Sequence, residues 1–269
     1  MSSPHPLDQG PVPEPLVAAL RDLASVKRLL VALDFDGTLA PEVDSPEHAR
    51  ALPEAREAVL ALLGMSNTRV ALVSGRSLRS LIEVADLPDN VLLVGSHGIE
   101  LRLDDPDARV SLDTAEIEQV EVLHEVLGEV ADEYDQVWLE PKPAGFALHT
   151  RLATEENSRL AHLVALSEAQ AEIENLTVRK GKNVLEFAVR STTKGEAVEH
   201  LRRYTAADAV FYAGDDVTDE DAFAALLPHD VGVKSGPGET EAAFRVAGPE
   251  EIAEVLSTLA AFRAATPAG

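Results

Sequence analysis

Two acidic residues follow an apolar run near the start of this chain. Asp34 and Asp36 come after the run at 29–33, one residue apart, and Gly37 and Thr38 continue the segment. A short apolar run that ends at a turn signal is typical of a strand buried on both faces. We therefore expect both acids at the carboxyl end of a strand, where open α/β sheets place their chemistry.

Further segments place polar groups beside predicted strands. In chain order they contribute a serine, a lysine and an acidic group, namely Ser74, Lys194, and Asp215 with Asp216 and Asp219. The carboxyl ends of parallel strands meet at one edge of a sheet, so these side chains should converge there. Carboxylates gathered in one crevice repel one another and need a hard cation, and oxygen ligands with retained water suit Mg²⁺.

This combination of residues fits covalent phosphoryl transfer. One aspartate of the first pair would attack phosphorus and form an aspartyl phosphate, while the other exchanges a proton with the leaving oxygen and then with water. Mg²⁺, Ser74, Lys194 and the amides of the turn at Gly37 would hold the phosphoryl oxygens as charge develops. The alternatives are structural, because aspartate favours turns and Ser74 could cap the helix that follows it.

The composition excludes several classes of protein. Acidic residues number 47 against 23 basic ones, and the formal charge of −24 argues against nucleic acid or an anionic membrane as a partner. The chain has no cysteine, so disulfides and thiolate chemistry are excluded. We find no secretory signal pattern and no apolar run of roughly 20 residues, and we expect a cytoplasmic protein, with a monomer favoured.

Alternating helix and strand patterns predict the fold. Apolar runs at 29–33, 70–75 and 90–98 alternate with helical periodicity at 47–63 and 77–87, which indicates a Rossmann-like, doubly wound parallel sheet. Later segments suggest two long helices over an antiparallel sheet. We expect a disordered or short helical segment at 1–25, an α/β core at 26–105 and 190–265, and an inserted α+β cap module at 106–189.

Four motifs in order resemble the haloacid dehalogenase-like superfamily. They are DFDGT at 34–38, VSGR at 73–76, the lysine of TTKG at 192–195, and GDDVTDED at 214–221. The resemblance implies that Asp34 is the nucleophile and Asp36 the general acid and base. It also implies that Ser74 and Lys194 are catalytic residues that bind the phosphate.

The same resemblance implies a magnesium site. Its ligands would be Asp34, the carbonyl of Asp36, and Asp215, with Asp219 either behind them or as an alternative ligand. The acids at 219–221 could also form a negatively charged first helical turn, which the helix dipole favours, and this is our interpretation of Glu220 and Asp221.

The inserted module and its hinges hold much of the scarce positive charge. Lys142, Arg151, Arg179, Lys180 and Lys182 lie there, mixed with Glu140, His149 and Glu186. A sugar phosphate, which is an anion with hydroxyl groups, fits this mixture. Strand alternation should point Lys180 away from its basic neighbours. We interpret Trp138 and Phe146 as core residues of the module.

Three segments are also similar to those of trehalose-6-phosphate phosphatases. They are EPKPAGFALHTR at 140–151, VRKGKNVLEF at 178–187 and GSHGIE at 95–100. The resemblance implies substrate contacts from Lys142, His149, Arg151, Arg179, Lys182 and Glu186, and we expect Glu140 to contribute as well. In the core we expect further substrate contacts from Gly37, Thr38, Gly75, Arg76, His97 and Asp216, although Arg76 and His97 fit structural roles equally well.

The resemblance implies a function and leaves two rivals open. The expected activity is Mg²⁺-dependent hydrolysis of trehalose 6-phosphate through an aspartyl phosphate, a step of trehalose biosynthesis. Within enzymes the alternative is another sugar phosphatase or a phosphohexomutase of the same superfamily. Outside enzymes it is a sugar-phosphate-binding sensor on the same fold, although such a sensor would not need to retain both Asp34 and Asp36.

Overall fold

The computed structural model describes residues 12–43, 45–104, 112–190 and 192–266. The chain divides into two compact units, Met1–Arg109 with Thr193–Gly269, and Val110–Thr192. Helix α1 (Glu14–Ala24) forms part of the expected N-terminal segment. Residues 1–11 of the expected disordered tail lie outside the described residues, as does the expected boundary between residues 105 and 106.

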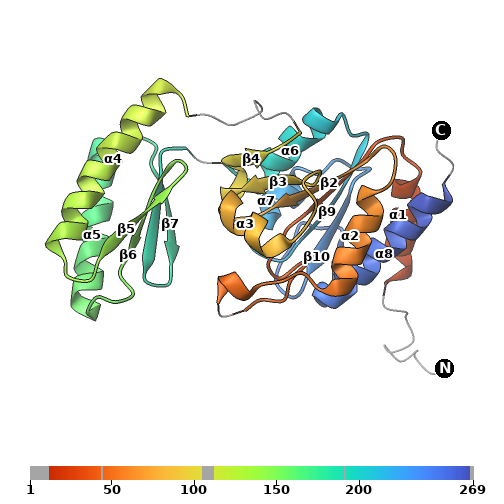
Figure 1. Ribbon diagram of the computed structural model, residues 1–269, viewed down its shortest axis with the longest axis horizontal. Coiled ribbons are helices and arrows are strands. Elements are labelled where there is room, and N and C mark those ends of the chain that lie inside the picture. Colours follow the sequence, from red (N-terminus) through yellow and green to blue (C-terminus); the bar gives the residue numbers. More distant parts are fainter. Residues whose placement is uncertain (1–11, 44, 105–111, 191, 267–269) are drawn as a thin grey trace. The chain divides into compact units, whose positions relative to one another are not determined.

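The first unit is built on a seven-stranded sheet (Figure 1). Its strands lie in the order β11 (Phe244–Val246), β10 (Val231–Ser235), β9 (Ala209–Gly214), β1 (Leu29–Leu33), β2 (Thr68–Val73), β3 (Leu92–Gly95), β4 (Glu100–Arg102). Every neighbouring pair is parallel except β3 with β4. The predicted doubly wound parallel core is therefore confirmed, and the carboxyl ends of β1, β2 and β9 share one edge.

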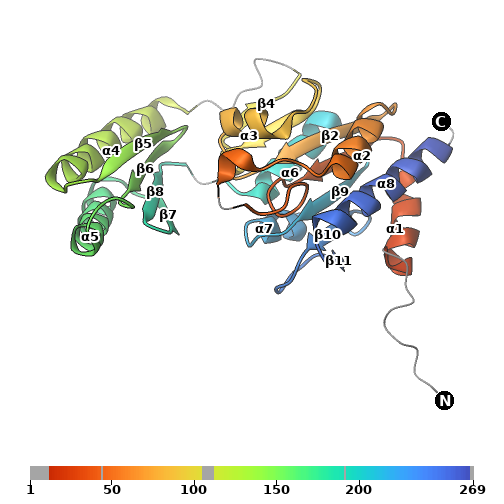
Figure 2. The ribbon, with the colours of Figure 1, turned by 60° about the horizontal axis from the view of Figure 1, so that its bottom comes forward.

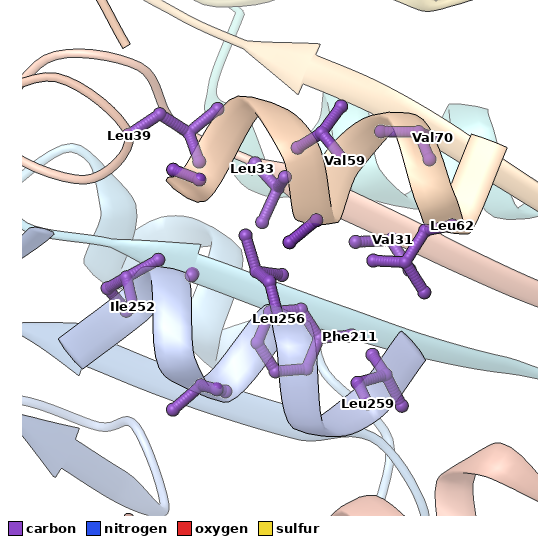
Figure 3. Packing of buried hydrophobic residues seen from close by; sticks show 14 of the residues in the cluster. Val31, Leu33, Leu39, Val59, Leu62, Val70, Phe211, Ile252, Leu256 and Leu259 are labelled. Carbon is purple, nitrogen blue, oxygen red and sulfur yellow. The ribbon is translucent and has the colours of Figure 1, made fainter. Parts of the chain in front are cut away.

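Helices cover both faces of this sheet. Helices α1, α2 (Pro53–Leu63), α3 (Leu78–Ala85) and α8 (Pro249–Ala265) contribute to one hydrophobic core, and α6 (Lys194–Thr205) with α7 (Asp219–Ala224) to the other. Side chains of β1 alternate between the two, so that Val31 and Leu33 enter the first core and Leu30 and Ala32 the second. Figure 3 shows the first core, in which Leu256 of α8 lies near Val31 and Leu33. Each large apolar side chain buried here contributes about 1.5–3 kcal/mol.

The residues at which α2 and α6 begin are set by local sequence signals. The helix expected over 47–63 begins only at Pro53, and Pro46–His48 forms a separate 3₁₀ turn, because proline is favoured at the first helical position. Thr193 caps α6, accepting from the amide of Glu196, whose side chain reaches back in a capping box. The cap makes Lys194 the first residue of its helix.

The second unit is a four-stranded antiparallel sheet with two helices. The strands lie in the order β5 (Trp138–Lys142), β6 (Gly145–His149), β8 (Val184–Ala188), β7 (Thr177–Gly181). Helices α4 (Thr114–Glu133) and α5 (Glu155–Glu172) lie on the same side of this sheet (Figure 2) and pack against Leu148 and Phe187. The predicted α+β character of this module is confirmed. No helix in the described ranges of either unit is long and apolar enough to cross a membrane.

Candidate active site

Asp34 directly follows the central strand β1 and is only 4% exposed. Its amide donates to the carbonyl of Ala213 at 2.9 Å, which extends the pairing with β9 by one residue. The ammonium of Lys194, at the start of α6, donates to Asp34 Oδ1 at 2.7 Å. A buried carboxylate without a partner would be strongly destabilising. This ion pair therefore holds one oxygen of Asp34 in a defined position.

Asp219 is fully buried, and its four acceptor positions are filled. Oδ1 accepts from Lys194 Nζ at 2.7 Å and from the Tyr212 hydroxyl at 2.5 Å. Oδ2 accepts from the amides of Asp215 at 3.0 Å and Asp216 at 2.9 Å. A carboxylate offers about four lone-pair sites. Asp219 therefore holds the lysine and the following loop in place, and it has no acceptor left for a metal ion.

Carboxylate oxygens of Asp34, Asp215 and Asp219 lie within 4.8 Å of one another. Burial and the charge of Asp219 raise the pKa of Asp34 well above its ordinary range, although Lys194 acts in the opposite direction. Burial and the charge of Asp219 also raise the pKa of Asp215 to about 6. Burial by itself would lower the pKa of Lys194, but the two aspartates outweigh it and raise that pKa. A cation would relieve this repulsion, and oxygen ligands of this kind fit Mg²⁺.

The turn after β1 lies directly against this cluster. Gly37 has a φ of +73°, and a Cβ atom added there would come within 2.0 Å of Asp215 Oδ2. Only glycine combines this conformation with so close an approach. The next residue, Thr38, is fully buried, and its hydroxyl has no hydrogen-bond partner among the described residues. A buried donor of this kind is satisfied when a ligand oxygen is present.

Asp36 is held by an arginine from the neighbouring strand end. Arg76 Nε and Nη2 donate to the two oxygens of Asp36 at 2.5 and 2.6 Å, and Arg76 Nη1 donates to Ser80 at 3.2 Å. The side chain of Arg76 is 10% exposed and that of Asp36 is 38% exposed. A bidentate ion pair fixes the orientation of both groups. Arg76 therefore contacts Asp36 in this structure.

The loops after β2 and β3 are held together by backbone hydrogen bonds. The amide of His97 donates to the carbonyl of Ser74 at 3.0 Å, and the amide of Ser96 donates to that of Arg76 at 2.7 Å. Both Ser96 and His97 have positive φ values, which cost energy for residues with side chains. The His97 ring lies so close to Gly75 that an added Cβ would come within 2.6 Å of it. These contacts place His97 beside the backbone of Ser74 and Gly75.

Ser74, in the loop after β2, and Asp216, in the loop after β9, each accept a hydrogen bond from a nearby amide, that of Arg76 at 3.1 Å and that of Val217. Ser77, and not Ser74, caps α3, so the Ser74 hydroxyl is not used to begin that helix. Asp216 is exposed, and its Oδ1 accepts from the amide of Val217 at 2.6 Å. In this structure the Asp216 carboxylate thus stabilises the loop itself.

The sheet of the second unit gathers the predicted polar residues on one face. Residues paired directly across antiparallel strands point to the same side. Glu140 pairs with Ala147, Ala147 with Glu186, and Glu186 with Arg179. By alternation, Lys142 and His149 lie on this face too. The opposite face carries Leu148 and Phe187 against the helices. We call the first one the polar face of the module.

A hydrogen-bonded group occupies the polar face. Glu140 accepts from Lys142 Nζ at 2.7 Å through Oε1 and lies 2.8 Å from His149 Nε2 through Oε2. Burial would raise the pKa of Glu140, but the hydrogen bonds of these two partners outweigh it and lower that pKa. The three side chains therefore form one hydrogen-bonded cluster. On the same face, Arg179 Nη2 donates to the carbonyl of Thr192 at 3.3 Å.

The interpretation of Trp138 as a core residue is wrong. Trp138 pairs with His149 across the sheet, and the two rings stack with centroids 5.0 Å apart. The Arg151 guanidinium lies 5.3 Å from the centre of the Trp138 ring. Trp138 therefore belongs to the polar face, whereas Phe146 lies in the core as expected. Lys182 lies exposed in the turn between β7 and β8.

Comparison with known proteins identifies the family. The family model for trehalose-phosphatase matches residues 32–254. The chain belongs to the trehalose-phosphatase family. It is 32% identical over 264 residues to a trehalose-phosphate phosphatase of Mycobacterium marinum, covering 93% of this chain and 66% of that protein. It is 34% identical over 243 residues to a bifunctional trehalose-6-phosphate synthase/phosphatase of Thermoproteus tenax, covering 88% of this chain and 33% of that protein.

A solved structure supports the same family. The trehalose-6-phosphate phosphatase of Aspergillus fumigatus is 25% identical and superposes with a TM-score of 0.66, covering 91% of this chain and 97% of that chain. The resemblance inferred from the sequence motifs is thus confirmed. The chain spans about two thirds of the length of the Mycobacterium marinum protein.

Several residues that shape the site were not identified from the sequence. Tyr212 holds Asp219, and Lys234 and Ser235, at the end of β10, contact the loops of the site. A signal for the last two was present, because polar residues directly follow the apolar run of β10 as they do after β1. No such signal existed for Tyr212, which lies inside an apolar strand and whose hydroxyl reaches its partner only in the folded protein.

Proposed function

We propose that the protein hydrolyses trehalose 6-phosphate to trehalose and phosphate with Mg²⁺ and through an aspartyl phosphate. The names of the relatives support the substrate. The main support for the reaction is the position of Asp34. Its carboxylate is buried at a strand end within a cluster of three carboxylates, and Lys194 holds its Oδ1. Such a held oxygen nucleophile fits in-line attack on phosphorus.

The proposed reaction has two steps. In the first, an Asp34 oxygen forms a bond to phosphorus, the bond from phosphorus to the sugar oxygen breaks, and Asp36 gives that oxygen a proton. In the second, Asp36 takes a proton from water as the water attacks phosphorus, and the bond to Asp34 breaks. Positioned proton transfer of this kind contributes about 10²–10⁴-fold in rate. The ammonium of Lys194 and the hydroxyl of Ser74 would stabilise the charge on the phosphoryl oxygens.

A magnesium ion fits the carboxylate cluster. Asp34, Asp215 and the carbonyl of Asp36 would hold it, whereas Asp219, whose acceptors are filled, would keep Asp215 and Lys194 in place. When bound, the ion would neutralise charge on the phosphoryl oxygens and lower the repulsion between the carboxylates. The buried hydroxyl of Thr38 is a further polar group available to the substrate.

The polar face of the module is proposed to recognise the sugar. Glu140 and His149 offer hydrogen bonds to hydroxyl groups, and the half-buried ring of Trp138 beside His149 offers apolar surface for a sugar ring. Arg179, Lys182 and Arg151 supply positive charge for the anion. In this proposal the module serves as a cap that excludes water and selects the substrate.

The test is phosphate release from a panel of sugar phosphates. Trehalose 6-phosphate should be hydrolysed much faster than glucose 6-phosphate, and only with Mg²⁺, so that EDTA abolishes the reaction. Equal rates for all hexose phosphates would favour the broader sugar-phosphatase alternative, and conversion to an isomeric phosphate would favour a phosphohexomutase. Tight binding without any phosphate release would favour the sensor.

Variants test the covalent step. Asp34→Asn should abolish release, whereas Asp221→Asn, which alters an exposed acid of α7, should leave the rate unchanged. Asp36→Ala should slow turnover yet still accept one phosphoryl group, visible by intact mass after brief exposure to substrate. Full activity of Asp34→Asn would rule out covalent catalysis by this residue.

A further inference from the structure

The backbone amides and carbonyl groups of Asp215 and Asp216 are all hydrogen-bonded to side chains. The two amides donate to Asp219 Oδ2 at 3.0 and 2.9 Å. The two carbonyl oxygens accept from the ammonium of Lys234, at 2.5 Å for Asp215 and 3.4 Å for Asp216. Both donors and both acceptors of this short segment are therefore fixed by charged side chains, which bind backbone groups more strongly than neutral ones.

Lys234 comes from β10 and is only 3% exposed. Its charge is paired with Glu220 Oε1 at 3.3 Å, and Glu220 Oε2 in turn accepts from Thr240 Oγ1 at 3.1 Å and the amide of Glu241 at 2.8 Å. A buried ammonium is tolerated only when its donors are used, and here all three have an acceptor. The lysine is thus built into the fold and makes no contact with the Asp34 carboxylate in the described structure.

The next residue of β10 holds the other side of the cluster. Ser235 Oγ donates to the carbonyl of Gly37 at 2.7 Å, and the Asp215 carboxylate lies against Gly37. The end of β10 therefore fixes the backbone on which Asp215 stands as well as the turn against which its side chain rests. This matters because the carboxylates of Asp34, Asp215 and Asp219 lie within 4.8 Å of one another, and like charges repel. A loop without such anchors would relax away from the repulsion.

We propose that Lys234 is a positioning residue that holds the Asp215 carboxylate in place for the divalent cation. This inference rests on the proposed function in one respect, namely that a divalent cation binds at Asp34 and Asp215. Lys234 acts through the carbonyl groups of the loop, and Glu220 keeps its ammonium directed toward them. Groups that orient metal ligands in this way typically change metal affinity by about 10–100-fold when they are removed.

The experiment measures Mg²⁺ binding by titration calorimetry on the full chain after treatment with EDTA. Lys234→Met keeps the length of the side chain and removes its donors, and we expect the Kd for Mg²⁺ to rise about 10–100-fold. Lys27→Met, which alters an exposed lysine of the same unit, is the matched control and should bind as the wild type does. The KM for trehalose 6-phosphate at saturating Mg²⁺ should change less than the Kd for the metal.

The outcomes separate this inference from the proposed function. Absence of Mg²⁺ binding by the wild type would reject the metal site itself. Binding by the wild type and by Lys234→Met with the same Kd would refute the role of Lys234, even if the variant melted at a lower temperature. If Lys234→Met has no cooperative melting transition, Glu220→Gln decides the matter, because it removes the charge that pairs with Lys234. We then expect a rise in Kd of about two- to fivefold, and an unchanged Kd would refute the inference.

Discussion

Replacement of Asp215 by asparagine is expected to stabilise the metal-free protein and to abolish its response to Mg²⁺. The Asp215 carboxylate lies within 4.8 Å of two other carboxylates, and no basic side chain pairs with it in the described ranges. Asparagine has the same shape without the charge. The change therefore removes repulsion from the fold and, at the same time, a ligand from the proposed metal site.

The size of the effect follows from the pKa of Asp215, which is about 6 in the folded protein against 3.8 for the ordinary side chain. This difference corresponds to about 3 kcal/mol at about 1.4 kcal/mol per pH unit. Asp215 is only partly buried, so solvent screening reduces the expected gain to about 1–2 kcal/mol. A raised carboxyl pKa means that the folded state holds the proton more tightly than the unfolded chain. The cost of ionisation is therefore absent below pH 3.8, grows up to about pH 6 and is complete above it.

The assay is thermal unfolding in EDTA across about pH 5 to 8, followed by the same scan in Mg²⁺. At the upper end, Asp215→Asn should melt about 2–8 °C above the wild type, and the gain should shrink below about pH 6. Magnesium at about 100 times its Kd should stabilise the wild type by about 2.7 kcal/mol and the variant hardly at all. Asp221→Asn, which alters an exposed acid of α7, is the control. A variant that melts at or below the wild-type temperature in EDTA at about pH 8 would refute the argument from repulsion.

Three further predictions concern other parts of the molecule. Gly37→Ala should lower kcat/KM by more than about 100-fold in a phosphate-release assay, because the new Cβ would lie 2.0 Å from an Asp215 oxygen at a φ of +73°. Arg263→Ala should destabilise the protein by about 2–4 kcal/mol in urea unfolding, because its guanidinium donates to four backbone carbonyls and one hydroxyl that join the start of the sheet to α8. Glu140→Gln should raise KM about tenfold and leave the Kd for Mg²⁺ unchanged, because it disrupts the contact with His149 on the polar face alone. An altered metal affinity in this last variant would contradict the separation of roles between the two units.

The fold could be predicted largely because its strands have strong local signals. The run at 29–33 is apolar throughout and ends at an acid, and it forms a central strand with every residue buried. The order of the strands could not be predicted, because it depends on which strands pair across long separations. The predicted start of the helix at residue 47 was wrong although the sequence contained the signal. Pro46 begins the 3₁₀ turn and Pro53 begins α2, and both prolines are visible in the sequence.

The residue types of the candidate site could be predicted from the sequence, but the contacts between these residues could not. The motifs name Asp34, Lys194 and Asp219, and the structure joins them through one ammonium group. The partner of Arg76 could not be inferred, because Asp36 lies 40 residues away and the contact depends on the reach of a long side chain. Trp138 could have been assigned correctly, since it lies two residues before Glu140 and must share its face of the strand.

The charges of the site favour a divalent cation over a monovalent one. Among the carboxylates of the site, Asp36 has Arg76 as its partner, and Asp34 and Asp219 share the single charge of Lys194. Lys234 adds nothing to this balance, because Glu220 is its partner. The cluster of Asp34, Asp215 and Asp219 with Lys194 therefore has a net charge of −2 when fully ionised. A divalent ion balances that charge, whereas Na⁺ or K⁺ would leave half of it, so neither should restore the activity or the stability lost in EDTA.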